Sequence, residues 1–330
     1  MSTNIQGLVD RTYREYLEPM DDLQPYTLLT SSLTDSDTTV SFNGDLLTQE
    51  EEDIMEAGSI IEIGQELMLC KTLSTTLDTV DVVRGVRGTT ASSHSSGATI
   101  KIAPPFPRKN VFDAVCDQIK NLYPTLFAVE TKSVSAKVGY IPLSGTSDNY
   151  LVAPISAISQ MTDFSAGSDE TGIIYQGVAV ELVDLPNPFT YTDADGNSQT
   201  ITYTNNGPNK VNALQVYGVS SGHTVFVTFK KKFIEPTAED NTLVEIGLEN
   251  EYEPIIMAGV AAQIIAGRDI PTATADYITD QLSTSTFPVN SAANIRTSLL
   301  RYQNDLIEQA RKDLRARYPE PVALNKITYA

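Results

Sequence analysis

The sequence predicts an α+β protein of more than one domain: a helical core, a small N-terminal β module and an inserted β-sandwich domain. Three observations predict this class. Short β-branched segments separated by glycine occupy residues 58–102, strand-like segments recur between residues 131 and 233, and helical spacing returns after them. In chain order, the predicted domains are an N-terminal helix with the small β module (1–105), a linking helix that packs with the C-terminal helices (106–130), the β-sandwich (131–235) and a helical domain with an extended C-terminal tail (236–330).

The residues before the β module predict one short helix and one strand. Apolar residues recur at steps of three and four from Ile5 to Leu17, and Pro19 ends this helix. Thr38–Phe42 is typical of a strand and is followed by an Asn-Gly turn. We interpret the acidic run Glu50–Asp53 as a solvated face, with a site for a cation or a basic partner as the alternative.

Residues 58–102 have the pattern of a compact antiparallel β unit. Its three apolar or β-branched segments are Ile60–Leu69, Leu77–Val83 and Ala98–Ile102. Gly85, Gly88 and Gly97 lie where turns are expected, because glycine adopts positive φ angles without steric cost. A stiff proline-rich hinge follows at residues 104–107, and then an amphipathic helix from Val111 to Tyr123 that Pro124 ends or kinks.

Residues 131–233 predict the β-sandwich. The strand-like segments are Ala136–Ile141, Val178–Val183, Phe189–Thr192, Thr200–Tyr203 and Thr224–Phe229. Asp193–Asn197 hints at a calcium loop, but an EF-hand needs glycine and glutamate where this chain has Ser198 and Thr204. An Asp-Gly hairpin turn is therefore the better interpretation of this segment.

Lys230, Lys231 and Lys232 form a compact basic run at the end of the last predicted strand. We interpret them as lysines that protect an exposed strand edge from pairing with another chain. Contact with phosphate or with an acidic neighbouring subunit is the alternative.

The last domain is predicted to be helical. Helical spacing runs from Tyr252 to Ala266, where small residues at positions 258–262 allow another helix to approach closely, and Gly267 stops the helix. A short helix around Asp276–Leu282 precedes a long one that starts near Ser291. The apolar face of the long helix carries Ile295, Leu299, Tyr302, Leu306, Ala310 and Leu314.

Basic residues mark the C-terminal end of the long helix. Arg301 with Asp305, and Glu308 with Lys312, are spaced four apart, which favours ion pairs. The cations clustered at its end are Arg311, Lys312, Arg315 and Arg317. The helix dipole favours cations there, and DNA binding is the alternative.

Residues in the β module also match a pattern, G-x-E … V-x-R-G-x-x-G-T-x-A-x-x-H-x-x-G-x-x-I/V. In this chain the matched valine, Val83, directly precedes Arg84, without the intervening residue of the pattern. The matching residues are Gly64, Glu66, Val83, Arg84, Gly85, Gly88, Thr89, Ala91, His94, Gly97 and Ile100. The pattern resembles one found in neck and tail proteins of tailed bacteriophages. The resemblance implies a structural role for His94, as a side chain that closes a turn, with catalysis or metal binding as the alternatives.

The C-terminal helices add to this resemblance. Their order looks like the helical part of phage head-to-tail connector, or adaptor, proteins, and it is carried by Tyr252, Ile255, Ile256, Gly259, Ala261, Ala262, Ile264, Ile265, Arg268, Asp269, Leu299, Tyr302, Asp305, Leu306 and Ala310. The two resemblances together cover under half of the chain. They imply that the predicted helical core is a helical connector core, to which the β-sandwich is an addition with no counterpart.

The resemblance implies a structural virion protein that forms a ring in the neck, joins the portal and head to the tail, and conducts DNA without binding it specifically. Twelve copies are favoured and six are possible, with the portal protein and other neck or tail proteins as partners. We expect assembly in the host cytoplasm and contacts to the portal or to neighbouring subunits through Arg301, Arg311, Lys312, Arg315 and Arg317. The alternatives are a tail or baseplate protein, or a glycan- or receptor-binding virion protein that uses the β-sandwich.

Composition limits the other classes. The 330 residues carry 23 basic and 42 acidic side chains, a net charge of −19, which disfavours general nucleic-acid binding and suits a DNA conduit. We therefore expect carboxylates on the lumen, and the cations of the long helix and of Lys230–Lys232 away from it.

The cysteines and the N-terminal residues give further expectations. Cys70 and Cys116 are expected to be buried free thiols. We expect no signal peptide and no membrane span.

Enzymes and sugar binders are the competing classes. The sequence lacks the common hydrolase, nucleotide-binding and zinc motifs, and its two histidines are His94 and His223. We therefore predict no enzyme activity, no cofactor and no metal. A catalytic pair of carboxylates stays an open alternative, because the sequence does not show how far apart the acidic side chains lie in space. Tyrosines that would furnish a sugar-stacking surface are Tyr140, Tyr150, Tyr175, Tyr191, Tyr203 and Tyr217. Packing within strands is their alternative role.

Overall fold

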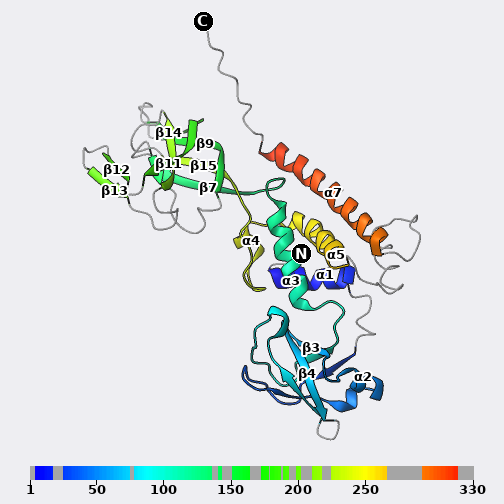
Figure 1. Cartoon of the computed structure of the whole chain (residues 1–330). Helices are drawn as coiled ribbons and strands as arrows, with labels where there is room; N and C mark the ends of the chain where they lie inside the picture. The colour runs from blue at the N-terminus through cyan, green and yellow to red at the C-terminus, as the bar shows by residue number, and fades with distance from the viewer. Residues whose placement is uncertain are drawn as a thin grey trace. The chain divides into compact units, whose positions relative to one another are not determined.

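A computed structural model of the chain is shown in Figure 1. It describes residues 4–17, 25–74, 78–135, 140–142, 151–163, 172–177, 179–186, 189–192, 198–201, 210–217, 224–265 and 292–318. Helices and antiparallel sheets are both present, so the predicted α+β class is confirmed. The chain forms two compact units. Unit 1 comprises Met1–Ile119, Pro236–Asn241 and Tyr252–Leu306, and unit 2 comprises Lys120–Glu235, Thr242–Glu251 and Ile307–Ala330.

Unit 1 contains a six-stranded antiparallel sheet that curls until its first and last strands meet. Its strands are β1 (Tyr26–Leu28), β2 (Thr39–Ser41), β3 (Ile60–Ile63), β4 (Glu66–Ser74), β5 (Thr79–Val83) and β6 (Thr99–Ile102), in the order β1-β6-β3-β4-β5-β2. Beyond β1 and β2 the chain pairs Leu29 with Phe42. The Asn43 N–H donates to the Leu28 carbonyl over 2.9 Å. These bonds close the sheet.

The interior of this sheet follows the alternation of the strands. Successive side chains of a strand point to opposite faces, so every second residue is buried inside. The buried core comprises Leu29, Leu33, Val40, Phe42, Met55, Ile61, Ile63, Met68, Cys70, Val80, Val82, Ile100 and Ile102. Burial in this core raises the pKa of the Cys70 thiol, whereas Cys116 is half-buried.

One prediction for this region needs correction, and one strand was missed. The run Ile60–Leu69 is not one strand but the hairpin of β3 and β4, which turns at Gly64 with φ +61°. Strand β1 was not predicted. Thr38–Phe42 does contain β2, as predicted, and Asn43 caps the short 3₁₀ turn η3 (Gly44–Leu46). The acidic run lies in the short helix α2 (Gln49–Ile54).

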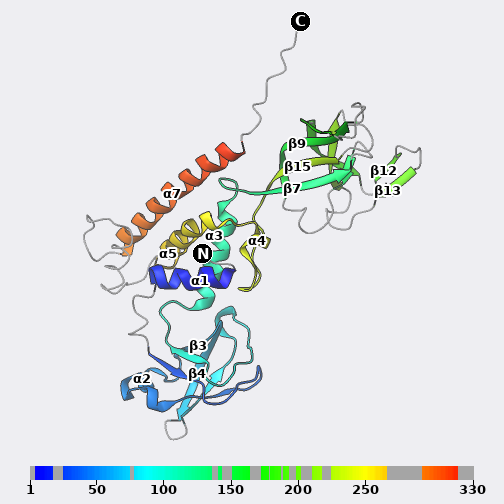
Figure 2. The same cartoon turned by 180° about the vertical axis from the view of Figure 1, so that it is seen from behind.

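Three helices of unit 1 pack around α5 (Glu253–Ile265). They are α1 (Ile5–Thr12) with its π-helical extension η1 (Tyr13–Leu17), α3 (Arg108–Leu122) up to Ile119, and α7 (Ala292–Arg317) up to Leu306. Both views show α1 and α3 alongside α5 (Figures 1 and 2). Helix α5 is apolar on nearly all sides and almost wholly buried, as a central helix should be. Its buried Glu253 accepts a bond from Arg11 of α1.

Small residues in α5 admit side chains of two other helices, as the sequence predicted. A Cβ atom on Gly259 would lie 2.2 Å from both the Gln118 Oε1 of α3 and the Gln303 Nε2 of α7. Those two amides are joined by a 2.8 Å bond in which Gln303 donates. Gln118 in turn donates to Gln263 of α5 over 3.0 Å. Gly259 thus makes room for a chain of amide bonds that links three helices.

We expect Gly259→Ala to lower the free energy of unfolding by about 1–2 kcal/mol, because the added methyl group displaces both amides. The measurement is chemical unfolding followed by circular dichroism. In a Gln118→Ala/Gln303→Ala background the methyl group has space, and Gly259→Ala should be neutral or stabilising there. An equal cost in both backgrounds would show that the amide contact is not the cause.

The described strands of unit 2 form three small antiparallel sheets. Their strands are β7 (Ala128–Ser135), β8 (Tyr140–Pro142), β9 (Leu151–Asp163), β10 (Gly172–Gly177), β11 (Ala179–Pro186), β12 (Phe189–Thr192), β13 (Ser198–Ile201), β14 (Lys210–Tyr217) and β15 (Thr224–Lys231). The sheet orders are β10-β9-β15-β7, β11-β14-β8 and β12-β13. Strand β11 contacts β9 of the largest sheet. The short helix α4 (Leu243–Ile246) is held by a capping box between Thr242 and Glu245.

The lysine run does not protect a strand edge, so that prediction is wrong. Strand β15 pairs with β7 on one side and β9 on the other, and its Lys231 is 9% exposed. Lys231 donates to the Glu130 carboxylate over 2.6 Å. Lys230 and Lys232 lie over the rings of Phe127 and Tyr123, at 4.8 and 5.3 Å from the ring centroids. Cation–π contacts and an ion pair therefore hold these side chains.

Several predicted features lie outside the described residues. They are Pro19, Asp193–Asn197, His223, Gly267, the short helix at Asp276–Leu282, the resemblance positions Arg268 and Asp269, the side chains of the six sandwich tyrosines and the tail from residue 319. Within the described ranges, no helix is both long enough and apolar enough to traverse a lipid bilayer.

Candidate functional site

Three residues of the G-x-E … R-G-x-x-G-T-x-A-x-x-H pattern, Arg84, Gly85 and His94, bond to the one buried carboxylate of the pattern, that of Glu66. Glu66, the first residue of β4, is 1% exposed. Its Oε1 accepts from Arg84 Nε at 2.6 Å and from the Gly85 N–H at 3.1 Å. Its Oε2 accepts from Arg84 Nη2 at 2.7 Å and from the Ser92 N–H at 3.1 Å, and lies 2.9 Å from His94 Nε2.

Arg84 connects this carboxylate to two loops. Besides its bidentate pair with Glu66, Arg84 donates through Nη1 to the carbonyls of Thr34 and Asp37, at 2.7 and 2.8 Å. Its Nη2 also donates to the Ser92 carbonyl at 2.6 Å. All five N–H groups of a guanidinium then have acceptors. Arg84 therefore holds the segment after β1 and the segment after β5 against the start of β4.

The loop between β5 and β6 needs the other residues of the pattern. Gly85 has φ +61°, and a Cβ there would lie 3.0 Å from the Thr89 carbonyl oxygen. The Thr89 hydroxyl donates to the Val86 carbonyl and accepts from the Leu67 N–H, at 2.8 and 3.1 Å. The pattern thus describes the residues that fasten one loop to the sheet.

His94 belongs to this fastening, in keeping with the turn-closing role expected of it. Its backbone pairs with Leu33 through two 2.8 Å bonds, and its ring lies between Ser92 Oγ, at 3.3 Å, and the Glu66 carboxylate. Burial would raise the pKa of Glu66, but the bonds from Arg84, His94 and Ser92 outweigh it and lower the pKa. The carboxylate is therefore ionised and fully engaged, as a structural group is.

This lowered pKa makes a prediction for acid pH. An unfolded glutamate titrates near about 4.3, and Glu66 in the folded chain titrates below that value. Its stabilising contribution is therefore present above the unfolded pKa and is lost as the pH falls through the folded pKa. We expect the difference in free energy of unfolding between the native chain and Glu66→Gln to shrink as the pH falls below about 4. A difference that stays constant from pH 7 to pH 3 would contradict the assignment.

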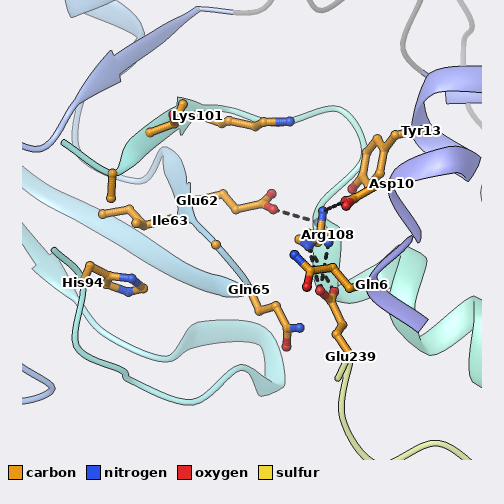
Figure 3. Close-up of a pocket in the computed structure, with 13 residues that line it drawn as sticks. Gln6, Asp10, Tyr13, Glu62, Ile63, Gln65, His94, Lys101, Arg108 and Glu239 are labelled. Carbon is orange, nitrogen blue, oxygen red and sulfur yellow. Dashed lines mark hydrogen bonds and ion pairs between the residues drawn. The ribbon is translucent and has the colours of Figure 1, made fainter. Parts of the chain in front are cut away.

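A polar pocket of about 480 Å³ lies in unit 1 around Arg108, the first residue of α3 (Figure 3). Arg108 donates to Asp10 of α1 at 2.7 Å and to both oxygens of Glu239, the shortest bond being 2.8 Å. Its backbone N–H donates to Glu62 Oε1 of β3 at 2.9 Å. One residue thus ties α1, α3, the segment Pro236–Asn241 and the sheet together.

The pocket around Arg108 carries mixed charge. Burial would lower the pKa of Arg108, but the carboxylates of Glu239 and Asp10 outweigh this and raise it. Lys101 also lines the pocket, with its ammonium 5.4 Å from the centroid of the Tyr13 ring. Within the described part of the chain, no three His, Cys, Asp or Glu side chains are grouped so as to hold a metal ion. The pocket's charges serve to join elements of unit 1.

The predicted contact residues all lie on α7, and they differ in their partners. Arg301, Lys312, Arg315 and Arg317 are exposed, and Arg311 is half-buried. Neither predicted pair, Arg301–Asp305 or Glu308–Lys312, is among the ion pairs of the described residues, and Glu308 instead accepts from Arg311 at 3.2 Å. The α7 helix is therefore charged as predicted but paired differently.

Arg317 has acidic partners within unit 2. Its two Nη atoms lie 3.1 Å from Glu249 and 2.9 Å from Glu251. Burial and the neighbouring Glu251 raise the pKa of Glu249. Arg317 is thus occupied by two carboxylates that lie outside α7, whereas Arg311 pairs within the helix.

A second pocket, of about 260 Å³, brings two of the predicted residues together with a third cation. Arg311 and Arg315 line it from α7, and Lys230 lines it from β15. The remaining lining residues are Pro124, Thr125, Phe127, Leu314 and Tyr318. Lys230 and the arginines of α7 were predicted as two separate basic clusters, because no local pattern in the sequence connects residues some eighty positions apart. Arg301, Lys312 and Arg317 do not line this pocket.

No model of a known protein family matches the sequence, and no curated protein matches it at a significant level.

Proposed function

We propose that this protein is a structural component of the neck of a tailed bacteriophage, where it forms a ring between the portal and the tail. The observation that carries the proposal is the double resemblance to neck proteins, in the β module and in the C-terminal helices. The geometry supports it because Arg84, Gly85 and His94 of the first pattern bind the buried Glu66 and so fasten a loop to the sheet, which is a structural role. The second pattern coincides with the buried helix α5 and with α7.

In this proposal the helices of unit 1 are the helical connector core, and the closed sheet is the small β module. The sheets of unit 2 are the inserted β-sandwich, which the chain enters after Ile119 and leaves before Pro236. The ring has twelve copies, with six as the alternative. A ring needs one face of each subunit to complement a different face of the next.

The net charge of −19 supports a role as a DNA conduit. Carboxylates on a lumen repel phosphate within a Debye length of about 8–10 Å at physiological salt, so DNA slides without being trapped. The proposal places the cations Arg301, Arg311, Lys312 and Arg315 against protein, with the portal as the partner. A lumen lined mainly by lysine and arginine would contradict it.

The test is a reconstruction of the virion by electron cryomicroscopy, with the chain fitted to the density. We expect a ring of copies beside the portal and in contact with it. Density at the tail tip or baseplate, with none beside the portal, would overturn the proposal and favour a tail protein. Density that projects from the virion surface through unit 2 alone would favour a receptor-binding protein.

A further inference from the structure

The second pocket, lined by Lys230, Arg311 and Arg315, combines three cations with an apolar surround. These cations come from two elements that are distant in the sequence, and Phe127, Leu314 and Tyr318 lie among them. None of the described residues that line the pocket is acidic. The chain as a whole has nineteen more acidic than basic side chains, so the basic lining of this pocket is opposite in charge to the rest of the chain.

Contacts within the chain hold two of the cations of this pocket in place, and an incoming anion can replace the partner of Arg311. Lys230 is held over the Phe127 ring, which leaves its charge in place. Arg311 pairs with Glu308 one helical turn away, through side chains that are 39% and 57% exposed. Such exposed pairs contribute little, so an incoming anion competes with Glu308 at small cost. Arg315 has no hydrogen bond or ion pair within the described structure.

From this arrangement we propose that the pocket binds an acidic segment of a partner protein, in which a carboxylate adjoins an aliphatic or aromatic side chain. Arginine binds planar carboxylates with two parallel hydrogen bonds, and two arginines one turn apart on α7 present such donors. The apolar lining residues then cover the neighbouring side chain of the partner segment.

Protein fits this pocket better than DNA. A cavity of about 260 Å³ holds one or two side chains and not a length of duplex. Three cations neutralise few phosphates, and the excess negative charge of the chain repels a long polyanion. The inference rests on the proposed function only for the identity of the partner, which in a neck is the portal or an adjacent subunit.

The test measures binding of labelled peptides to the full chain. The probe is a peptide with the sequence of residues 48–55, TQEEEDIM, which places carboxylates beside an isoleucine. Its counterpart TQQQQNIM lacks the charges, and inorganic phosphate and a single-stranded oligonucleotide are the other probes. We expect TQEEEDIM to bind and Arg311→Gln/Arg315→Gln to weaken its affinity by about tenfold or more. The matched control, Lys71→Gln/Arg87→Gln, removes the same charge at two exposed residues of unit 1 and should change the affinity less than about twofold.

Three outcomes would overturn the inference: no binding of the acidic peptide, equal binding of its amide counterpart, or equal losses in the pocket and control variants. Binding of the oligonucleotide but not the peptide, lost in the pocket variant, would make this a phosphate site. Circular dichroism of both variants shows whether they fold. These outcomes are separate from the neck proposal, because density at a tail tip would leave the peptide result unchanged.

Discussion

Replacing Arg84 with alanine is expected to lower the free energy of unfolding by about 3–5 kcal/mol, the cost of leaving a buried carboxylate unpaired. Glu66 is 1% exposed and would keep only the N–H groups of Gly85 and Ser92 and the His94 ring. The carbonyls of Thr34, Asp37 and Ser92 would also lose their donor. Chemical unfolding measures the loss, and hydrogen exchange of amides in β4 and β5 locates it.

Arg87→Ala is the matched control. Arg87 lies in the same loop and is exposed, so its removal should change the free energy of unfolding by less than about 0.5 kcal/mol. Arg84→Lys keeps the positive charge but loses the paired guanidinium donors. Its cost in free energy of unfolding should therefore lie between those of Arg84→Ala and Arg87→Ala. If Arg84→Ala and Arg87→Ala cost the same, the fastening around Glu66 does not stabilise the fold.

Replacing Arg108 with methionine is expected to cost about 2–4 kcal/mol, because it removes the shared partner of two carboxylates while keeping most of the side-chain volume. Glu239 is the more buried of the two, with a side chain 10% exposed, and Asp10 is 47% exposed. Most of the cost therefore arises at Glu239. Unfolding in urea gives the magnitude, and faster exchange of the amides in α1 and at the start of α3 would show where contact is lost.

Lys109→Ala is the control for this site, since it removes the neighbouring cation, its pair with the exposed Asp113 and its contact with the Phe112 ring. Its expected cost is below about 1 kcal/mol. A second variant, Arg108→Met with Glu239→Gln, removes the unpaired charge and should regain part of the stability. Absence of any recovery would place the role of Arg108 in packing and not in its ion pairs.

Much of unit 1 was predictable because its signals are local. Alternation in β5 and β6 places Val80, Val82 and Ile100 inside the sheet, and helical spacing finds α5 and α7. The glycines of the loop after β5 have the positive φ angles that their positions suggested. Gly64 was the signal for the β3–β4 turn, but the apolar residues on both sides made one long strand the simpler interpretation.

The pairing of distant residues was not predictable in the same way. Arg108 and Glu239 are 131 positions apart, and nothing near either residue indicates the other. The lysines after Phe229 resembled edge protection because the sequence does not show that β15 has a neighbour on each side. Glu66 was part of the recognised pattern, yet its burial depends on a sheet that closes, which only the fold reveals.

The closure of this sheet has a consequence for contacts between copies of the chain. The backbone groups around Leu28, Leu29 and Phe42 already bond across the seam between β1 and β2. A second copy therefore has no row of open donors and acceptors at this seam onto which it can add a strand. Any contact between copies at the bonded positions of this seam is therefore made by side chains, and the paired backbone there does not template the fibrous growth that open strands invite.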